Sequence, residues 1–232
     1  MGMSMIPHPD LPTIVFDLDG TLAETAPDLI WTLNAVLAEI GLKPIPFELA
    51  RDLIGAGARA LIQRGLATEG REMDEAEIEG LFKRFLTLYE TRLCVETHLY
   101  PHVTESLEIL KQRGHRLAVC TNKMEYHSIK LIDALGIAPY FSAICGRDTF
   151  AFYKPDARHL THTVMKAGGD PAKAIMIGDS RTDIDTASNA GLPSIGVPFG
   201  YTDTPMAALN PDVLISHYSE LPKAIETLLA RG

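Results

Sequence analysis

The chain has 232 residues, of which 46% are hydrophobic and 22% are charged, and its formal net charge is −9. This length suits one large domain, or one domain that carries a smaller insertion, built around a substantial core. The acidic balance and the absence of a basic run argue against nucleic acid as a partner, and no apolar stretch is long enough to span a membrane.

The first predicted element is a short buried strand at residues 14–16, where three apolar residues include two β-branched ones. Asp17 and Asp19 follow at a spacing of two, which places both side chains on one face of an extended chain. Ligands bind at the carboxyl ends of parallel strands, and two carboxylates there would repel each other unless a cation lay beside them. Asp19-Gly20 is also a common turn sequence, so these residues alone are also compatible with an ordinary surface turn.

Residues 23–97 show helical periodicity and no strand pattern. The apolar spacing predicts helices over 27–40, 48–53, 59–66 and 75–92, and the run Gly55-Ala56-Gly57 breaks the pattern between the second and the third. We therefore expect a small helical cap domain over residues 23–97, inserted directly after the first strand. Residues 1–22 and 98–232 would form the core.

The core sequence alternates helices with strands. This alternation predicts an α/β fold, a parallel sheet with helices on both of its faces. The predicted strands are 116–120, 143–145, 174–177, 194–197 and 213–215, and the predicted helices are 103–113, 124–135, 156–167, 183–189 and 220–229.

Polar residues follow several of these strands. Thr121 and Asn122 follow the second strand, Lys154 lies in the loop after the third, and Asp179 follows the fourth, with Asp183 one turn later. If the strands are parallel neighbours, these groups meet the first pair of carboxylates at one edge of the sheet. The carboxylates suit a hard cation, and Mg²⁺ is the best match. The lysine would neutralise phosphate charge, and the threonine would hydrogen-bond a phosphate oxygen.

From about residue 11 onward, the chain resembles the haloacid dehalogenase superfamily of aspartate-nucleophile phosphatases. Four motifs match in order: Asp17-Leu18-Asp19-Gly20-Thr21, Thr121-Asn122, Lys154-Pro155, and Gly178-Asp179-Ser180 with Asp183. The resemblance implies a Rossmann-like core with a helical cap. Within the superfamily, the segments 26–29 and 54–61 are similar to those of bacterial phosphoglycolate phosphatases. Glu24-Thr25 and Tyr100-Pro101-His102 depart from the Asp-Ser and Tyr-Pro-Gly that are usual there.

The resemblance also implies roles for individual residues. Asp17 would attack phosphorus and form an aspartyl-phosphate, and Asp19 would protonate the leaving alkoxide and then accept a proton from water. Gly20 would let the phosphate approach the backbone. Thr121 and Lys154 complete the expected catalytic group. The expected metal site comprises Asp17, Asp19 through its backbone carbonyl, Asp179 and Asp183, the last directly or through water or the lysine.

The expected substrate is a small anionic phosphomonoester, with 2-phosphoglycolate as the best single choice. Gly20, Thr21 and Asn122 are expected to contact it, and Arg59 is expected to bind its carboxylate, unless Arg59 only starts a helix and faces solvent. The alternatives are an inorganic pyrophosphatase, a sugar-phosphate phosphatase, a β-phosphoglucomutase-like enzyme and, from another class, a non-catalytic phosphate-binding regulatory module.

The compartment and the assembly are predicted less directly. Residues 1–12 lack the cationic and apolar regions of a signal peptide. The three cysteines are widely spaced and odd in number, which predicts free thiols in a reducing compartment. We therefore expect a cytoplasmic protein that is a monomer or a homodimer. The cysteines are Cys94, Cys120 and Cys145.

Overall fold

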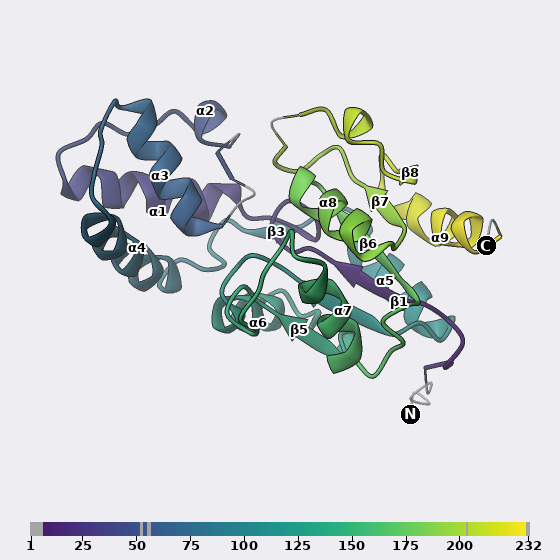
Figure 1. The fold of residues 1–232 in the computed structure, drawn as a ribbon. Coiled ribbons are helices and arrows are strands. Elements are labelled where there is room, and N and C mark those ends of the chain that lie inside the picture. The colour runs from purple at the N-terminus through teal and green to yellow at the C-terminus, as the bar shows by residue number, and fades with distance from the viewer. Residues whose placement is uncertain (1–6, 52, 55–56, 203, 231–232) are drawn as a thin grey trace.

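The computed structural model describes residues 7–51, 53, 54, 57–202 and 204–230. In this part of the chain, six parallel strands form one sheet in the order β5-β4-β1-β6-β7-β8. The first strand lies inside the sheet, between β4 and β6 (Figure 1), and this confirms the predicted parallel α/β core. The bounds are β1 Thr13–Phe16, β4 Leu117–Cys120, β5 Ala143–Cys145, β6 Ala174–Gly178, β7 Ser194–Gly196 and β8 Val213–Leu214.

Helices cover both faces of this sheet. Ile14 and Phe16 of β1 pack in one hydrophobic cluster with α5, α6 and α9, whereas Val15 packs in a second cluster with α7 and α8. Because both faces are covered, every residue of β1 is buried, and its residues 14–16 form a continuous apolar run. The helices are α5 Val103–Gln112, α6 Glu125–Ala134, α7 Ala157–Lys166, α8 Arg181–Ala190 and α9 Leu221–Leu229.

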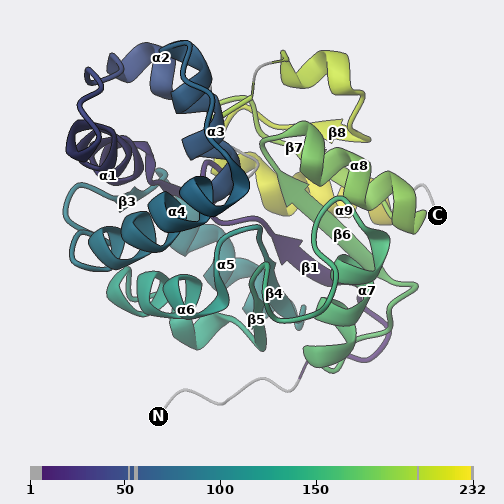
Figure 2. The same cartoon turned by 60° about the vertical axis from the view of Figure 1, so that its left-hand side comes forward.

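In the described part of the chain, the helices α1 to α4 lie together beside the sheet, as Figures 1 and 2 both show. We call them the helical unit, and the rest of the fold the sheet unit. A capping box starts the longest of these helices, because Asp74 accepts the N–H of Glu77 and the Glu77 side chain accepts the N–H of Asp74. The helices are α1 Ala26–Glu39, α2 Phe47–Arg51, α3 Ala58–Thr68 and α4 Glu75–Glu90. The domain boundaries at residues 22 and 98 stay a prediction, and Gly55-Ala56 lies outside the described residues.

The expectation of no strand within residues 23–97 is wrong at one place. Ala23–Glu24 (β2) pairs antiparallel with His98–Leu99 (β3), so a short ladder joins the two connections between the units. A strand of two residues is too short to show an alternating pattern. Asp28 in α1 strengthens this region, because its Oδ2 accepts the backbone N–H groups of residues 95, 96 and 97 at 2.8–3.0 Å.

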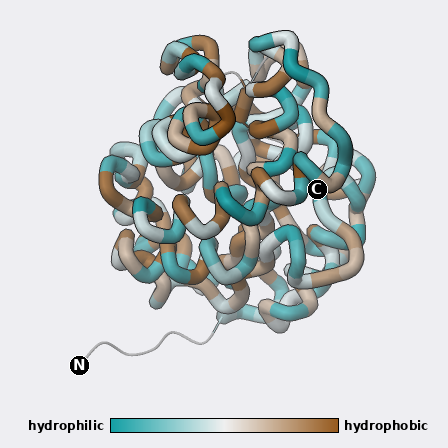
Figure 3. The backbone as a smooth tube through the Cα atoms, turned by 90° about the vertical axis from the view of Figure 1, so that its left-hand side faces the viewer, coloured by the Kyte–Doolittle hydropathy of each residue, from teal (hydrophilic) through white to brown (hydrophobic). Residues whose placement is uncertain are grey.

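Hydrophobic and hydrophilic residues alternate along the chain (Figure 3), as expected for helices that bury one face. Short 3₁₀ helices at Ala138–Tyr140, Met206–Leu209 and Tyr218–Glu220 complete the described secondary structure. Among the described residues, no helix combines the length and the apolar character needed to cross a membrane.

Candidate active site

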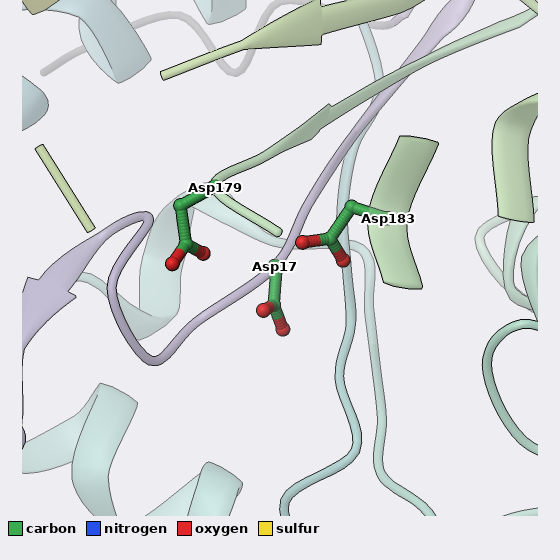
Figure 4. A group of neighbouring side chains, drawn as sticks. All are labelled: Asp17, Asp179 and Asp183. Atoms are coloured by element: carbon green, nitrogen blue, oxygen red, sulfur yellow. The ribbon is translucent and has the colours of Figure 1, made fainter. Parts of the chain in front are cut away.

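Three carboxylates meet at the carboxyl edge of the sheet. Asp17 follows β1, Asp179 follows β6, and Asp183 lies in the first turn of α8, so three separate segments contribute (Figure 4). One oxygen of each carboxylate lies within 4.8 Å of the others, and all three side chains are buried. The neighbouring positions of β1 and β6 bring the first two together.

Burial and mutual repulsion disfavour three negative charges at this point. Burial raises the pKa of Asp17 from 3.8 to about 6, with Asp183 adding to the increase and Lys154 opposing it. Burial also raises the pKa of Asp179 well above its usual value, and the charges of Asp183 and Asp17 contribute further. A bound cation would relieve this repulsion by favouring the ionised carboxylates.

Lys154 supplies a positive charge inside this cluster. Its Nζ lies 2.9 Å from Oδ1 of Asp17 and donates to Oδ1 of Asp183 at 2.6 Å. Burial lowers the pKa of Lys154, but the two carboxylates outweigh burial and raise it above its usual value, so the side chain stays an ammonium. We call Asp17, Asp179, Asp183 and Lys154 the site cluster.

Both oxygens of Asp179 accept hydrogen bonds from distant parts of the chain. The hydroxyl of Thr21 donates to Oδ1 and the backbone N–H of Tyr201 donates to Oδ2, each at 2.6 Å. The chain can approach this closely because Gly20 and Gly200 lack side chains, since a Cβ at either position would clash with the carboxylate. Gly20 also has a φ of +82°, which L-residues rarely adopt. Thr21, predicted to contact substrate, is therefore engaged with Asp179.

Asp183 is held from two sides. Its Oδ2 accepts the N–H and the hydroxyl of Ser180 at 3.1 and 2.7 Å, which caps α8, and its Oδ1 accepts from Lys154. Asn122 contacts the backbone of the same lysine, because its side-chain amide donates to the Lys154 carbonyl at 3.1 Å. The predicted residues Asn122, Lys154 and Asp183 thus form one connected group.

A cavity of about 520 Å³ opens above these strand ends, between the sheet unit and the helical unit. Asp17, Asp19, Thr121 and Asn122 line its sheet side. Residues of α3 and α4 line the opposite side, including Arg59, Phe85 and Tyr89. The predicted nucleophile, the predicted acid–base residue and the predicted phosphate-binding threonine therefore share one cavity.

Asp19 does not belong to the group of three clustered carboxylates and pairs with Lys123. The Lys123 Nζ donates to the Asp19 oxygens at 3.0 and 3.2 Å and to the Tyr89 hydroxyl at 2.7 Å. Tyr89 belongs to α4, so this lysine connects the helical unit to the turn that carries Asp17 and Asp19. Sequence reasoning missed both residues as site residues. Lys123 directly follows Thr121-Asn122 and could have been found by the same strand-end argument, whereas nothing in the sequence indicates Tyr89.

Arg59 lies in the first turn of α3 and lines the cavity, but its charge is already paired. It donates to Glu79 at 2.6 Å and to Glu75, both on α4. The expectation that Arg59 binds the substrate carboxylate stays a prediction. To bind it, the guanidinium would have to share its N–H groups between the substrate and a glutamate, or give up a glutamate in exchange for the substrate.

The donor set fits a divalent cation such as Mg²⁺. Asp17, Asp179 and Asp183 offer hard oxygen ligands close together, and the cation would offset the repulsion that raises the carboxylate pKa values. The Asp19 side chain lies outside this group of ligand atoms because it pairs with Lys123. Its expected contribution through the backbone carbonyl stays a prediction.

Comparison with known proteins places this geometry in a family. The family model described as haloacid dehalogenase-like hydrolase matches residues 14–197, which include every member of the site cluster. The chain belongs to the haloacid dehalogenase-like hydrolases. This confirms the resemblance that the four motifs indicated.

Two relatives that match almost the whole chain are named phosphoglycolate phosphatase. A phosphoglycolate phosphatase of Agrobacterium fabrum is 48% identical over 98% of both chains. One of Mesorhizobium japonicum is 46% identical over 95% of this chain and 97% of its own. A solved structure from Haemophilus somnus, described as a predicted phosphoglycolate phosphatase, has a TM-score of 0.85 and 33% identity, covering 96% of this chain and 99% of that one. The full-length likeness includes the helical unit.

Proposed function

We propose that this protein hydrolyses 2-phosphoglycolate to glycolate and phosphate, with Mg²⁺ as cofactor and an aspartyl-phosphate on Asp17 as intermediate. The observation that carries this proposal is the site cluster, in which a buried ammonium and three carboxylates converge below a cavity of about 520 Å³. Membership in the hydrolase family supports a phosphomonoester hydrolase, and the names of the full-length relatives support this substrate.

Asp17 is the group that would attack phosphorus, because its carboxylate lines the cavity next to the Lys154 ammonium. The lysine, 2.9 Å away, would balance the charge of the incoming phosphate and hold the carboxylate in place. Asp183 and Asn122 fix the lysine through its ammonium and its backbone carbonyl. Thr121 lines the same wall and would donate its hydroxyl proton to a phosphate oxygen.

Asp19 is the proposed acid–base residue. It lies in the same turn as Asp17 and lines the cavity. It would protonate the alkoxide oxygen of glycolate as the P–O bond breaks. It would then accept a proton from the water that attacks the aspartyl-phosphate. Lys123 holds it in position and also donates to the Tyr89 hydroxyl, and we propose that the helical unit excludes bulk water during these steps.

The metal site would use the oxygens of Asp17, Asp179 and Asp183. When bound, Mg²⁺ supplies positive charge that lets a phosphate dianion approach a carboxylate. Thr21 and the Tyr201 backbone orient Asp179 for this role through two hydrogen bonds of 2.6 Å.

Steady-state assays on a panel of phosphate esters test the proposal. The panel contains 2-phosphoglycolate, pyrophosphate, glucose 6-phosphate, β-glucose 1-phosphate and p-nitrophenyl phosphate, each measured with Mg²⁺ and with excess EDTA. We expect the highest kcat/KM for 2-phosphoglycolate and no turnover in EDTA. A higher kcat/KM for another member would replace the substrate, full activity in EDTA would refute the metal mechanism, and phosphate binding without turnover would indicate a regulatory module.

The expectations on compartment and assembly stay proposals. A cytoplasmic location is supported by three free cysteines, two of which, Cys120 and Cys145, are register partners on adjacent strands and are buried as thiols. The proposed assembly is a monomer or a homodimer, and the mass of the purified protein in solution distinguishes them.

A further inference from the structure

The cavity offers its ligand few free positive charges. Among the described residues that line it, the cationic side chains are Arg59, Lys123 and Arg147. Arg59 is paired with two glutamates of α4, and Lys123 is paired with Asp19. A ligand that carries a second anionic group, besides the phosphate held near Asp17, would therefore have to displace an ion pair or use Arg147.

Arg147 has no acidic partner among the described residues. The adjacent carboxylate of Asp148 forms no ion pair with it, and its Oδ1 instead accepts the N–H of Glu125 at the start of α6, at 2.7 Å. The Arg147 guanidinium instead lies over the ring of Tyr153, 3.5 Å from its centroid. Stacking covers one face of the planar group and leaves its edge N–H groups available for a planar anion.

The backbone of Arg147 is anchored beside the proposed catalytic residues. It follows β5, and its N–H donates to the carbonyl of Lys123 at 2.9 Å, in the loop that carries Thr121. Its guanidinium extends toward the helical unit, because a Cβ added at Gly57, just before α3, would lie 4.0 Å from Nη1. Arg147 therefore lines the cavity at a point where the start of α3 approaches the sheet unit.

We propose that Arg147 determines specificity by binding the carboxylate of the substrate in a bidentate contact. This inference rests on the proposed function, since it assigns the recognition of the glycolate half of 2-phosphoglycolate. An unpaired guanidinium that is oriented by a ring and matches the shape of a carboxylate is better suited to this contact than one already shared between two glutamates.

The test compares 2-phosphoglycolate with 2-hydroxyethyl phosphate, which has a hydroxymethyl group in place of the carboxylate. For each protein, the ratio of the two kcat/KM values is measured with Mg²⁺, and this ratio cancels any difference in the fraction of active enzyme. We expect Arg147→Gln to lower the ratio about 10- to 100-fold, mainly through KM for 2-phosphoglycolate. Arg147→Lys should recover part of the loss, because a lysine keeps the positive charge but cannot make the bidentate contact of a guanidinium.

Arg158→Gln is the matched control. Arg158 is an exposed arginine of α7 that pairs with Asp156 outside the cavity lining, and its ratio should equal that of the wild type. Arg59→Gln is measured in parallel as the competing candidate. A ratio that falls in the Arg59 variant and not in the Arg147 variant overturns the proposal.

The outcomes also separate this proposal from the one on which it rests. If the wild type prefers 2-phosphoglycolate and Arg147→Gln keeps that preference, Arg147 is not the specificity residue while the proposed substrate stands. If the wild type hydrolyses both esters with equal kcat/KM, the proposed substrate is wrong, and the Arg147 assignment is refuted with it.

Discussion

The site cluster and the helical unit hold their functional groups in different ways. In the site cluster, every carboxylate follows a strand of the sheet unit or caps one of its helices. The hydrogen bonds join residues far apart in sequence, such as Thr21 with Asp179 and Lys154 with Asp183. All of these atoms are buried. Removing one partner from such a network leaves a buried charge or an unsatisfied donor, at a cost of about 3–5 kcal/mol.

The helical unit meets the site through a side-chain hydrogen bond and through a close approach of its backbone. Tyr89 hydrogen-bonds Lys123, and a Cβ at Gly57 would lie 3.2 Å from the Asn122 carbonyl. At the connections between the units, Arg51 of α2 donates to Glu24 and to the carbonyl of Phe199, at 3.0 and 2.9 Å. The comparison suggests that the reacting groups are fixed by the sheet, while the groups around the rest of the substrate depend on how the helical unit is placed.

The largest expected effect is that of Asp17→Asn, which removes the proposed nucleophile from the site cluster. We expect kcat to fall by at least about 10⁴-fold and no phosphoenzyme to form, because an amide cannot attack phosphorus here. Rapid quench with radiolabelled substrate measures the covalent phosphate. Incorporation of phosphate by this variant would contradict the assigned role.

Asp19→Ala should have the next largest effect, and this effect should depend on the leaving group. Loss of the proton donor should reduce kcat/KM for 2-phosphoglycolate by about 10²–10⁴-fold. The reduction should be smaller for p-nitrophenyl phosphate, whose leaving group needs no proton. Parallel assays of both esters check this, and an equal reduction for both would exclude Asp19 as the acid.

Gly200→Ala tests whether the site cluster can accommodate an added methyl group, in comparison with an open position in the helical unit. The added Cβ would clash with the Asp179 carboxylate, so we expect a loss of about 1–3 kcal/mol in the free energy of unfolding and a higher Mg²⁺ requirement. Gly80→Ala in α4 is the matched control. Its Cβ would meet nothing within 4 Å, and we expect a gain of about 0.5–1 kcal/mol. Urea unfolding measures both, and a neutral Gly200→Ala would show that the cluster can relax.

Tyr89→Phe should have the smallest effect, because it removes one hydrogen bond between the units and keeps the ring beside Lys123. We expect kcat/KM to fall about 5-fold, in line with about 1 kcal/mol for a buried hydrogen bond. Tyr126→Phe removes a hydrogen bond between the same two units, to Glu90, at the exposed surface, and should change activity less than about 2-fold. Equal effects of the two variants would mean that the contact to Lys123 has no special part in catalysis.

Much of the sheet region was predictable from local signals. The strand at residues 14–16, the alternation of helices and strands, and the polar residues at strand ends all appear in the sequence, because buried parallel strands require continuous apolar runs and their carboxyl ends meet at one edge. The structure brings Asp17, Asp179, Asp183 and Lys154 together as that argument predicts.

The environment of each predicted residue was not predictable in the same way. Sequence reasoning placed Thr21 and Asn122 against the substrate, and the structure engages them with Asp179 and with the Lys154 carbonyl. It did not assign roles to Lys123 and Arg147, although both follow strands. The β2–β3 ladder was missed because two residues carry no periodicity.

The sequence by itself therefore determined the fold class, the family and the identity of the proposed reacting residues, since each rests on a local pattern or a motif. Only the tertiary structure decided which charges remain free. Whether Arg59 or Arg147 has an acidic partner depends on how α4 packs on α3 and on how Asp148 meets α6. Pairing of charges is a property of positions in space, and residues that are distant in the chain set it.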